Sequence, residues 1–154
     1  MWQKRQIGYD NDFVTIQSGG GCSSSIGRFG GEQFLTLGDF CFNDGTIAHE
    51  FIHAFGFWHE HNRPDRDQYV QILEQNIEFN QDHNFAKRRN SLTFGLPYDG
   101  LSVMHYQSNF FSIGRNEKTI ISKVNHFKFV TYVTLFLCAA SFWLLENSRE
   151  EEFR

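Results

Sequence analysis

Alternating apolar and polar residues near the start of the chain predict a β-strand at Asp12–Gln17. A polar, glycine-rich run breaks this strand, and Ser23–Gly38 then predicts two short strands joined through Gly30 and Gly31. The first part of the chain is therefore expected to consist of short strands.

The pattern becomes helical over residues 43–56, where Thr46 is a suitable N-cap and Gly56 a suitable C-terminal stop. Apolar side chains surround nearly the whole of this helix, at Ile47, Phe51, Ile52, Ala54 and Phe55. A helix that is apolar on all sides is normally buried, so this one is expected at the centre of the fold.

The second half of the chain gives a mixed signal. Tyr69–Leu73 has the character of an extended segment and Asn80–Asn90 that of a short polar helix, while Thr93–Tyr106 carries Gly, Pro and Asp-Gly turn signals. The expected order of elements is strands first, then one buried helix, then a loop-rich second half.

Composition limits the class of protein. The 154 residues suffice for one domain, and 40% hydrophobic with 21% charged residues is typical of a globular protein. The net charge of −4 shows no basic excess, which argues against nucleic acid as the main partner. The first residues contain no apolar core of signal-peptide length.

The composition changes after Val124, where the uncharged run Phe129–Leu145 begins a few residues later. As a helix this run would be about 25 Å long, at the short limit for crossing a bilayer. Membrane association through residues 129–145 therefore stays open.

The cysteines give a partial signal. Cys22 and Cys41 lie in one short polar segment, whereas Cys138 lies in the apolar run. A bridge between Cys22 and Cys41 would stabilise the fold by roughly 3 kcal/mol in the loop-entropy model. Their spacing alone leaves two free thiols as an equal alternative.

The strongest chemical signal lies on the predicted helix. His49 and His53 are four residues apart, which places both imidazoles on one face, as two ligands of one metal would be. Gly56 allows a sharp turn, after which His59 can return as a third ligand. Three nitrogen ligands are typical of a catalytic zinc site, and Glu50 beside them would take a proton from a water that zinc acidifies.

Other interpretations of these residues fit the spacing less well. A structural zinc site would need a fourth protein ligand, and no Cys, His or Asp stands at a compelling position for it. We expect His61 to be a solvated neighbour of the site. The spacing of His83, His105 and His126 does not indicate ligands.

These motifs resemble those of a known family. The pattern HExxHxxGxxH from His49 to His59 is the metzincin signature. Its extension "HEHNRPDRD", the segment "SVMHY" at Ser102–Tyr106 and the segment "GCSSSIGRFGGEQFLTLGDFC" are similar to the astacin family of zinc metalloendopeptidases. The resemblance covers about Asp12 to Lys123 and implies an α+β, two-lobed domain, with a twisted sheet and a central zinc-binding helix.

The resemblance also implies roles for single residues. His49, His53 and His59 would bind one zinc ion per chain, and Glu50 would be the catalytic base. Tyr106 would stabilise the oxyanion as a switchable ligand. Three residues would be structural. Met104 would lie under the imidazoles, Glu60 would contact the amino terminus of the mature enzyme, and Gly56 would form the turn.

Further expectations concern location and extent. A Cys22–Cys41 disulfide, an extracellular location and protein or peptide substrates are implied, with substrate paired to an edge strand, the Ser23–Leu37 segment. Residues 1–123 would form a partial catalytic domain and residues 124–154 a non-matching tail. The alternative function is a truncated or membrane-attached fragment that binds zinc without cleaving peptides. The sequence does not indicate the oligomeric state.

Overall fold

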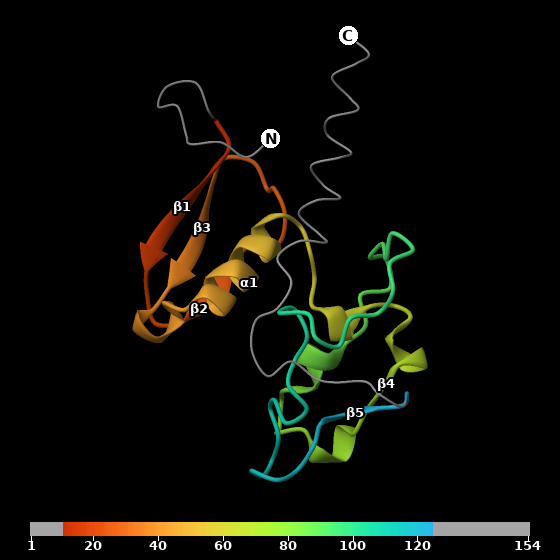
Figure 1. The fold of residues 1–154 in the computed structure, drawn as a ribbon. Coiled ribbons are helices and arrows are strands. Elements are labelled where there is room, and N and C mark those ends of the chain that lie inside the picture. Colours follow the sequence, from red (N-terminus) through yellow and green to blue (C-terminus); the bar gives the residue numbers. More distant parts are fainter. Residues whose placement is uncertain (1–10, 125–154) are drawn as a thin grey trace.

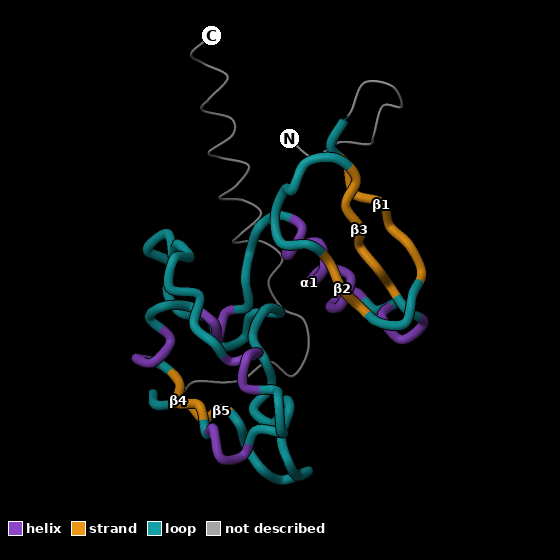
Figure 2. The backbone as a smooth tube through the Cα atoms, turned by 180° about the vertical axis from the view of Figure 1, so that it is seen from behind, coloured by secondary structure: helices purple, strands orange, loops and turns teal. Residues whose placement is uncertain are grey.

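The computed structural model describes residues 11–124, which form two lobes joined by the chain that follows the single α-helix (Figure 1). The upper lobe contains a three-stranded sheet and the helix, and the lower lobe is mostly loops (Figure 2). The main elements are β1 (Phe13–Ser18), β2 (Cys22–Ser24), β3 (Glu32–Leu37), α1 (Asp44–Ala54), β4 (Val70–Ile72) and β5 (Ile120–Ser122). Strands first, one helix, then loops is the order that the sequence predicts.

The strand order in the upper sheet is β1-β3-β2. β3 is central and pairs in parallel with β1 and antiparallel with β2. The expected edge strand Ser23–Leu37 is therefore wrong as a unit, because the part that became β3 has a partner on both sides. The edge available to another strand on this side of the sheet belongs to β2. The sequence could not reveal this, because strand order depends on a crossover connection that leaves no local signal.

The sheet core forms on the inward face of β3. Leu35 and Leu37 are buried there together with Cys41, and the partly buried Ile47 and Phe51 of α1 pack against them. Phe34 points to the opposite face and is 45% exposed. This period-two alternation fixes the register, since a slip by one residue would move both leucines into solvent.

Helix α1 begins at Asp44, and its N-cap is Asn43 instead of the expected Thr46. The Asn43 Oδ1 atom accepts a hydrogen bond from the Thr46 N–H at 3.0 Å. Asparagine is at least as good an N-cap as threonine, and its carboxamide reaches an amide that the helix itself leaves unpaired. The C-terminal expectation holds, because the helix ends just before Gly56, whose φ is +102°.

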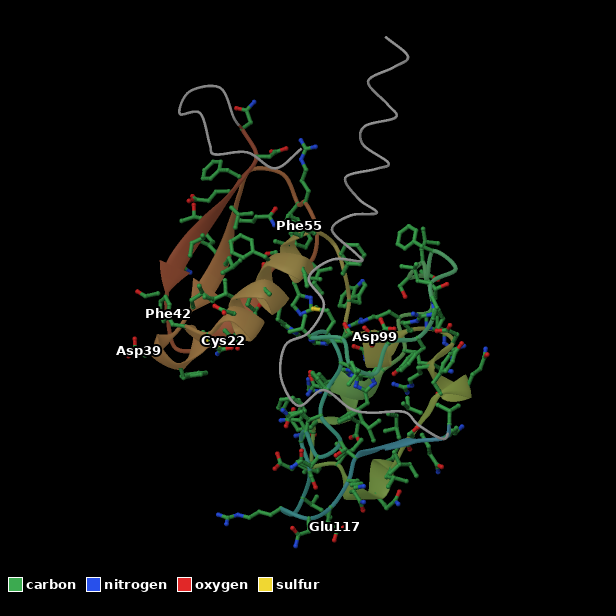
Figure 3. All side chains as sticks on the ribbon, in the orientation of Figure 1. Cys22, Asp39, Phe42, Phe55, Asp99 and Glu117 are labelled. Carbon is green, nitrogen blue, oxygen red and sulfur yellow. A yellow bond between two sulfur atoms is a disulfide. The ribbon has the colours of Figure 1, made fainter. Side chains whose placement is uncertain are left out.

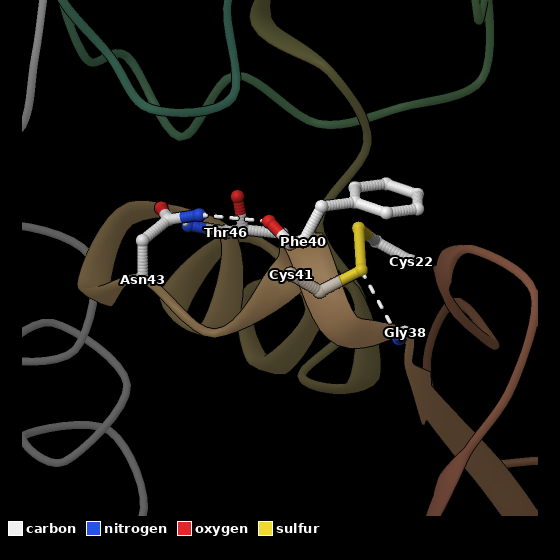
Figure 4. Close-up of a disulfide and its surroundings, with 6 residues drawn as sticks. All are labelled: Cys22, Gly38, Phe40, Cys41, Asn43 and Thr46. Carbon is white, nitrogen blue, oxygen red and sulfur yellow. Dashed lines mark hydrogen bonds between the residues drawn. A yellow bond between two sulfur atoms is a disulfide. The ribbon is translucent and has the colours of Figure 1, made fainter.

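A disulfide joins Cys22 at the start of β2 to Cys41, which lies in a 3-10 turn at Asp39–Cys41 just before α1 (Figure 4). The Gly38 N–H also donates to Cys41 Sγ at 3.2 Å. Of the two alternatives that the spacing left open, the bridge is the one present. It ties the edge strand directly to the beginning of the central helix.

The lower lobe has its own core. Five residues are buried in it: Val70, Ile77, Phe85, Tyr98 and Ile120. The expected helix at Asn80–Asn90 is wrong, since only a 3-10 turn at Asp82–Phe85 forms. Here the carbonyls of Asn84 and Ala86 accept hydrogen bonds from the side chains of His61 and Asn62. These carbonyls are therefore not paired with backbone N–H groups of an α-helix.

Within residues 11–124 no helix is long and apolar enough to cross a membrane. The apolar run Phe129–Leu145 and Cys138 lie outside the described residues, as does the rest of the tail beyond Val124.

The disulfide generates a first prediction. Replacing both Cys22 and Cys41 with serine should lower the free energy of unfolding by about 3 kcal/mol, because the unfolded chain regains the entropy of an open loop. Urea unfolding of both proteins would measure the difference. Cys138→Ser serves as the matched control and should leave stability unchanged. A peptide map of the non-reduced protein that links Cys138 to Cys22 or Cys41 would contradict the expectation.

Candidate active site

The three histidines of the sequence motif meet at the end of α1. His49 and His53 lie one turn apart on the helix. The Gly56 N–H donates to the His53 carbonyl at 2.8 Å, and the positive φ of Gly56 turns the chain back sharply. A side chain would be strained in this backbone conformation. The turn brings His59 back to the two helical histidines.

Distances between ring nitrogens test whether zinc fits. His59 Nε2 lies 3.2 Å from His49 Nε2 and 3.2 Å from His53 Nε2. Nitrogen ligands at about 2.0–2.1 Å from a tetrahedral zinc ion lie about 3.3–3.4 Å from one another. The cluster therefore fits zinc. A closed structural site would need a fourth protein donor, and within residues 11–124 only these three donors converge.

The other ring nitrogens fix how each imidazole is turned. His49 Nδ1 lies 2.9 Å from the Val103 carbonyl, and His53 Nδ1 lies 2.8 Å from the Phe57 carbonyl. Since a carbonyl can only accept, Nδ1 of His49 and of His53 carries the hydrogen and Nε2 keeps its lone pair. Such partners orient metal-binding histidines and define their tautomer.

The protein also keeps these rings uncharged. Burial lowers the pKa of His49, that of His53 to about 4 and that of His59 to about 3. Repulsion between the histidines adds to the shift for His53 and His59. Neutral imidazoles at physiological pH are the form that binds a metal.

Glu50 lies beside these ligands and is only 5% exposed. Its Oε2 atom is buried and has no hydrogen-bond partner among the described residues. Burial raises the pKa of this carboxyl to about 7. An unpartnered buried carboxyl oxygen is costly unless the site supplies a partner, and a water molecule at a metal is such a partner. The Glu50 Oε2 atom is thus open to a partner of this kind.

Tyr106 reaches the site from the lower lobe, and Met104 precedes it in the same segment. The Tyr106 ring centroid lies 4.8 Å from that of His59, and burial raises the Tyr106 pKa above its usual value. Met104 is 5% exposed, and its carbonyl accepts a hydrogen bond from the Glu60 N–H at 2.9 Å. The segment that carries both residues is thereby tied to the loop that carries His59.

Glu60 has partners within the described residues. Its Oε1 atom accepts from Arg63 Nη1 at 2.8 Å and from the Asp99 N–H at 2.9 Å (Asp99 is labelled in Figure 3). The Glu60 carboxylate thus connects the loop after the histidines to the segment before Met104. The structural role expected for Glu60 stays a prediction, now with these partners.

His61 differs from expectation. It is not a solvated neighbour, since its side chain is fully buried, with 0% exposure. The cause is the 3-10 turn Glu60–Asn62, which points His61 and Asn62 into the lower lobe. In the sequence, the only sign of this burial is that both residues directly follow His59. A turn this short has no hydrophobic periodicity that could indicate its buried side. His83 is exposed, and the donor atoms of His105 do not join the cluster.

Comparison with known proteins agrees with this geometry. The family model described as Astacin, a family of peptidases, matches residues 2–131. Zinc metalloproteinase nas-30 of Caenorhabditis elegans is 40% identical over 83% of this chain and 18% of that protein. Meprin A subunit beta of Rattus norvegicus is 41% identical over 77% of this chain and 17% of that protein.

A solved structure is also similar. High choriolytic enzyme 1, a hatching enzyme zinc-protease from the medaka fish Oryzias latipes, superimposes with a TM-score of 0.77 at 37% identity. The match covers 84% of this chain and 64% of that chain. The chain therefore spans under two thirds of the solved relative and about a fifth of the two curated relatives above.

The α+β fold is similar to that of a zinc-protease, and the three-histidine centre fits a zinc ion. The chain belongs to the astacin family, whose model matches most of its length. The family and the histidine cluster together support one zinc ion per chain, as the sequence predicts.

The ligand geometry generates a second prediction. His53→Ala removes one of three converging nitrogens, so the zinc content of the purified protein should fall from about one per chain to nearly none. Elemental analysis after dialysis would measure it. His83→Ala, which changes an exposed histidine, should keep the full zinc content. A His53→Ala protein that still holds one zinc would show that the ligands lie elsewhere.

Proposed function

We propose that this chain is a zinc-dependent endopeptidase that hydrolyses peptide bonds of protein or peptide substrates. The observation that carries the proposal is Glu50, a buried carboxyl with an unpartnered oxygen beside three neutral imidazoles. The matches to astacin-family proteins support this function and give no separate support to the alternative of a zinc-binding fragment that does not cleave.

His49, His53 and His59 would hold zinc through their Nε2 atoms. When bound, zinc would polarise the substrate carbonyl and lower the pKa of a water molecule at the site. Glu50 would take the proton from that water at Oε2 and later deliver it to the nitrogen of the leaving amine. Burial raises the pKa of Glu50, which strengthens the carboxylate as a proton acceptor.

Tyr106 would act on the oxygen of the substrate carbonyl. Because burial raises its pKa, the phenol stays protonated at neutral pH and can donate a hydrogen bond. That bond becomes stronger as the carbonyl oxygen gains negative charge during attack by water, which lowers the barrier. Met104 would supply the apolar support under the imidazoles, and Gly56 the turn that brings in His59.

Substrate would bind in extended form along the free edge of β2. This strand lies against α1 (Figure 2), and the loop that follows it is bonded to the helix end, with the Gly27 N–H donating to the His53 carbonyl at 2.9 Å. A peptide paired with β2 would therefore run close to the histidines. The Cys22–Cys41 disulfide fits an extracellular location for this activity.

The role of Glu50 generates a third prediction. Glu50→Gln keeps the size of the side chain but removes its basicity, so kcat for peptide cleavage should fall by about 10²–10⁴-fold. Zinc content should stay at one per chain, since Glu50 is placed as a base and not as a ligand. Cleavage of a fluorogenic peptide alongside elemental analysis would test both statements. Unchanged cleavage would refute the assignment of Glu50.

The role of Tyr106 generates a fourth prediction. Tyr106→Phe keeps the ring but removes the hydroxyl, so kcat should fall by about 10²-fold while KM changes little. The hydroxyl would act mainly in the transition state, which is why the effect falls on kcat. Tyr98→Phe is a matched control, because it removes another buried hydroxyl of the lower lobe, one that bonds to His105. An equal loss of kcat in both variants would count against a specific role for Tyr106.

A further inference from the structure

His61 is a buried titratable residue beside the site, and the proposed mechanism gives it no task. Its ring is in contact with two functional rings. The centroid of His61 lies 5.3 Å from that of His59 and 4.0 Å from that of Tyr106, and both pairs are stacked within 30° of parallel. His59 and Tyr106 are themselves 4.8 Å apart, so the three rings touch one another pairwise.

We propose that His61 is a positioning residue, which fixes the third zinc ligand and the Tyr106 phenol relative to each other. The inference rests on the proposed function for the role of Tyr106, but its consequence for zinc binding does not depend on peptide cleavage. His61 does not touch the reacting atoms itself, since its nitrogens are not part of the converging donor group.

His61 is held rigidly by the lower lobe. Its Nε2 atom lies 3.1 Å from the Asn84 carbonyl, and its own carbonyl accepts from Arg66 Nη1 at 2.9 Å. The rings of Phe85 and His105 lie against it, with centroids at 5.9 and 5.8 Å. A ring confined on all these sides can transmit its position to the two rings it touches.

An imidazole occupies this buried position, although burying a hydrocarbon ring would cost less free energy. Because the Asn84 carbonyl only accepts, the hydrogen of His61 lies on Nε2. Nδ1 is buried and has no partner among the described residues. Phenylalanine would avoid the unpaired nitrogen but would lose the bond to Asn84, and with it the fixed angle of the ring.

A site of this kind tolerates only small displacements of its side chains. Metal ligands and oxyanion donors act only when held close to their productive geometry, and a misplacement of about 1 Å can cost about 10²-fold in rate. His59 follows α1 in a loop, and Tyr106 comes from the other lobe. Of the described contacts, the stack on His61 connects both rings to one rigid support. The next residue, Asn62, is held by the same segment, as its side chain donates to the Asn84 carbonyl at 3.0 Å.

The main test uses His61→Phe in the full chain, which keeps an aromatic ring but removes the bond to Asn84. We expect the zinc dissociation constant, measured by chelator competition, to rise about 10-fold, because the ring that packs on His59 loses its fixed angle. For peptide cleavage, kcat should fall about 10-fold with KM within about twofold. In a Tyr106→Phe background the further loss of kcat should be much smaller, because both changes act on one group.

The control is Val70→Ala, which creates a defect in the buried core of the same lobe. It should lower thermal stability but leave zinc affinity and kcat near wild type. The proposal is overturned if His61→Phe binds zinc as tightly as wild type, or if Val70→Ala reproduces its losses. A wild-type chain that binds zinc but cleaves no peptide would refute the proposed function, while the comparison of zinc affinities would still decide the role of His61.

A measurement on the wild-type chain covers the case in which His61→Phe does not fold. Nitrogen NMR of the ¹⁵N-histidine-labelled, zinc-loaded protein should show His61 protonated at Nε2 and bare at Nδ1, with slow exchange of the Nε2 hydrogen. The opposite tautomer would mean that the ring is not tied to Asn84, and would overturn the proposal.

Discussion

The backbone turn at Gly56 is the constraint on which the site depends. An α-helix can place two imidazoles one turn apart on one face, but a third nitrogen at a tetrahedral position must come from outside the helix. The positive φ at Gly56 reverses the chain within a few residues and lets His59 approach both helical histidines at the same distance. The helix and the turn are both encoded locally, so this half of the site is preorganised by a short stretch of chain.

The second half of the site depends on contacts between distant segments. His49 is oriented by the Val103 carbonyl, and the Glu60 N–H is bonded to the Met104 carbonyl. These bonds join α1 and its following loop to the segment that supplies Tyr106. Of the helical histidines, His49 is thus oriented from the opposite lobe and His53 by the Phe57 carbonyl of the turn.

The features that could be predicted from the sequence are those of the first, locally encoded half of the site. The helix, its end at Gly56 and the converging histidines could be predicted, because each depends on spacing within a few residues. The edge strand could not, since β3 occupies the centre of the sheet through a crossover. His61 could not either, because its burial depends on Asn84, Phe85 and Tyr106, which lie far along the chain. The expected helix near Asn84 failed for a related reason, since its carbonyls are used by His61 and Asn62.

The bond between His49 and Val103 also has a consequence for the order of folding. It closes a separation of 54 residues, whereas α1 forms from neighbouring residues. Local helices form much faster than contacts that close long loops. The two helical histidines can therefore be in place before the carbonyl that orients one of them arrives. The full set of bonds around the three histidines is thus complete only in a chain whose two lobes have come together.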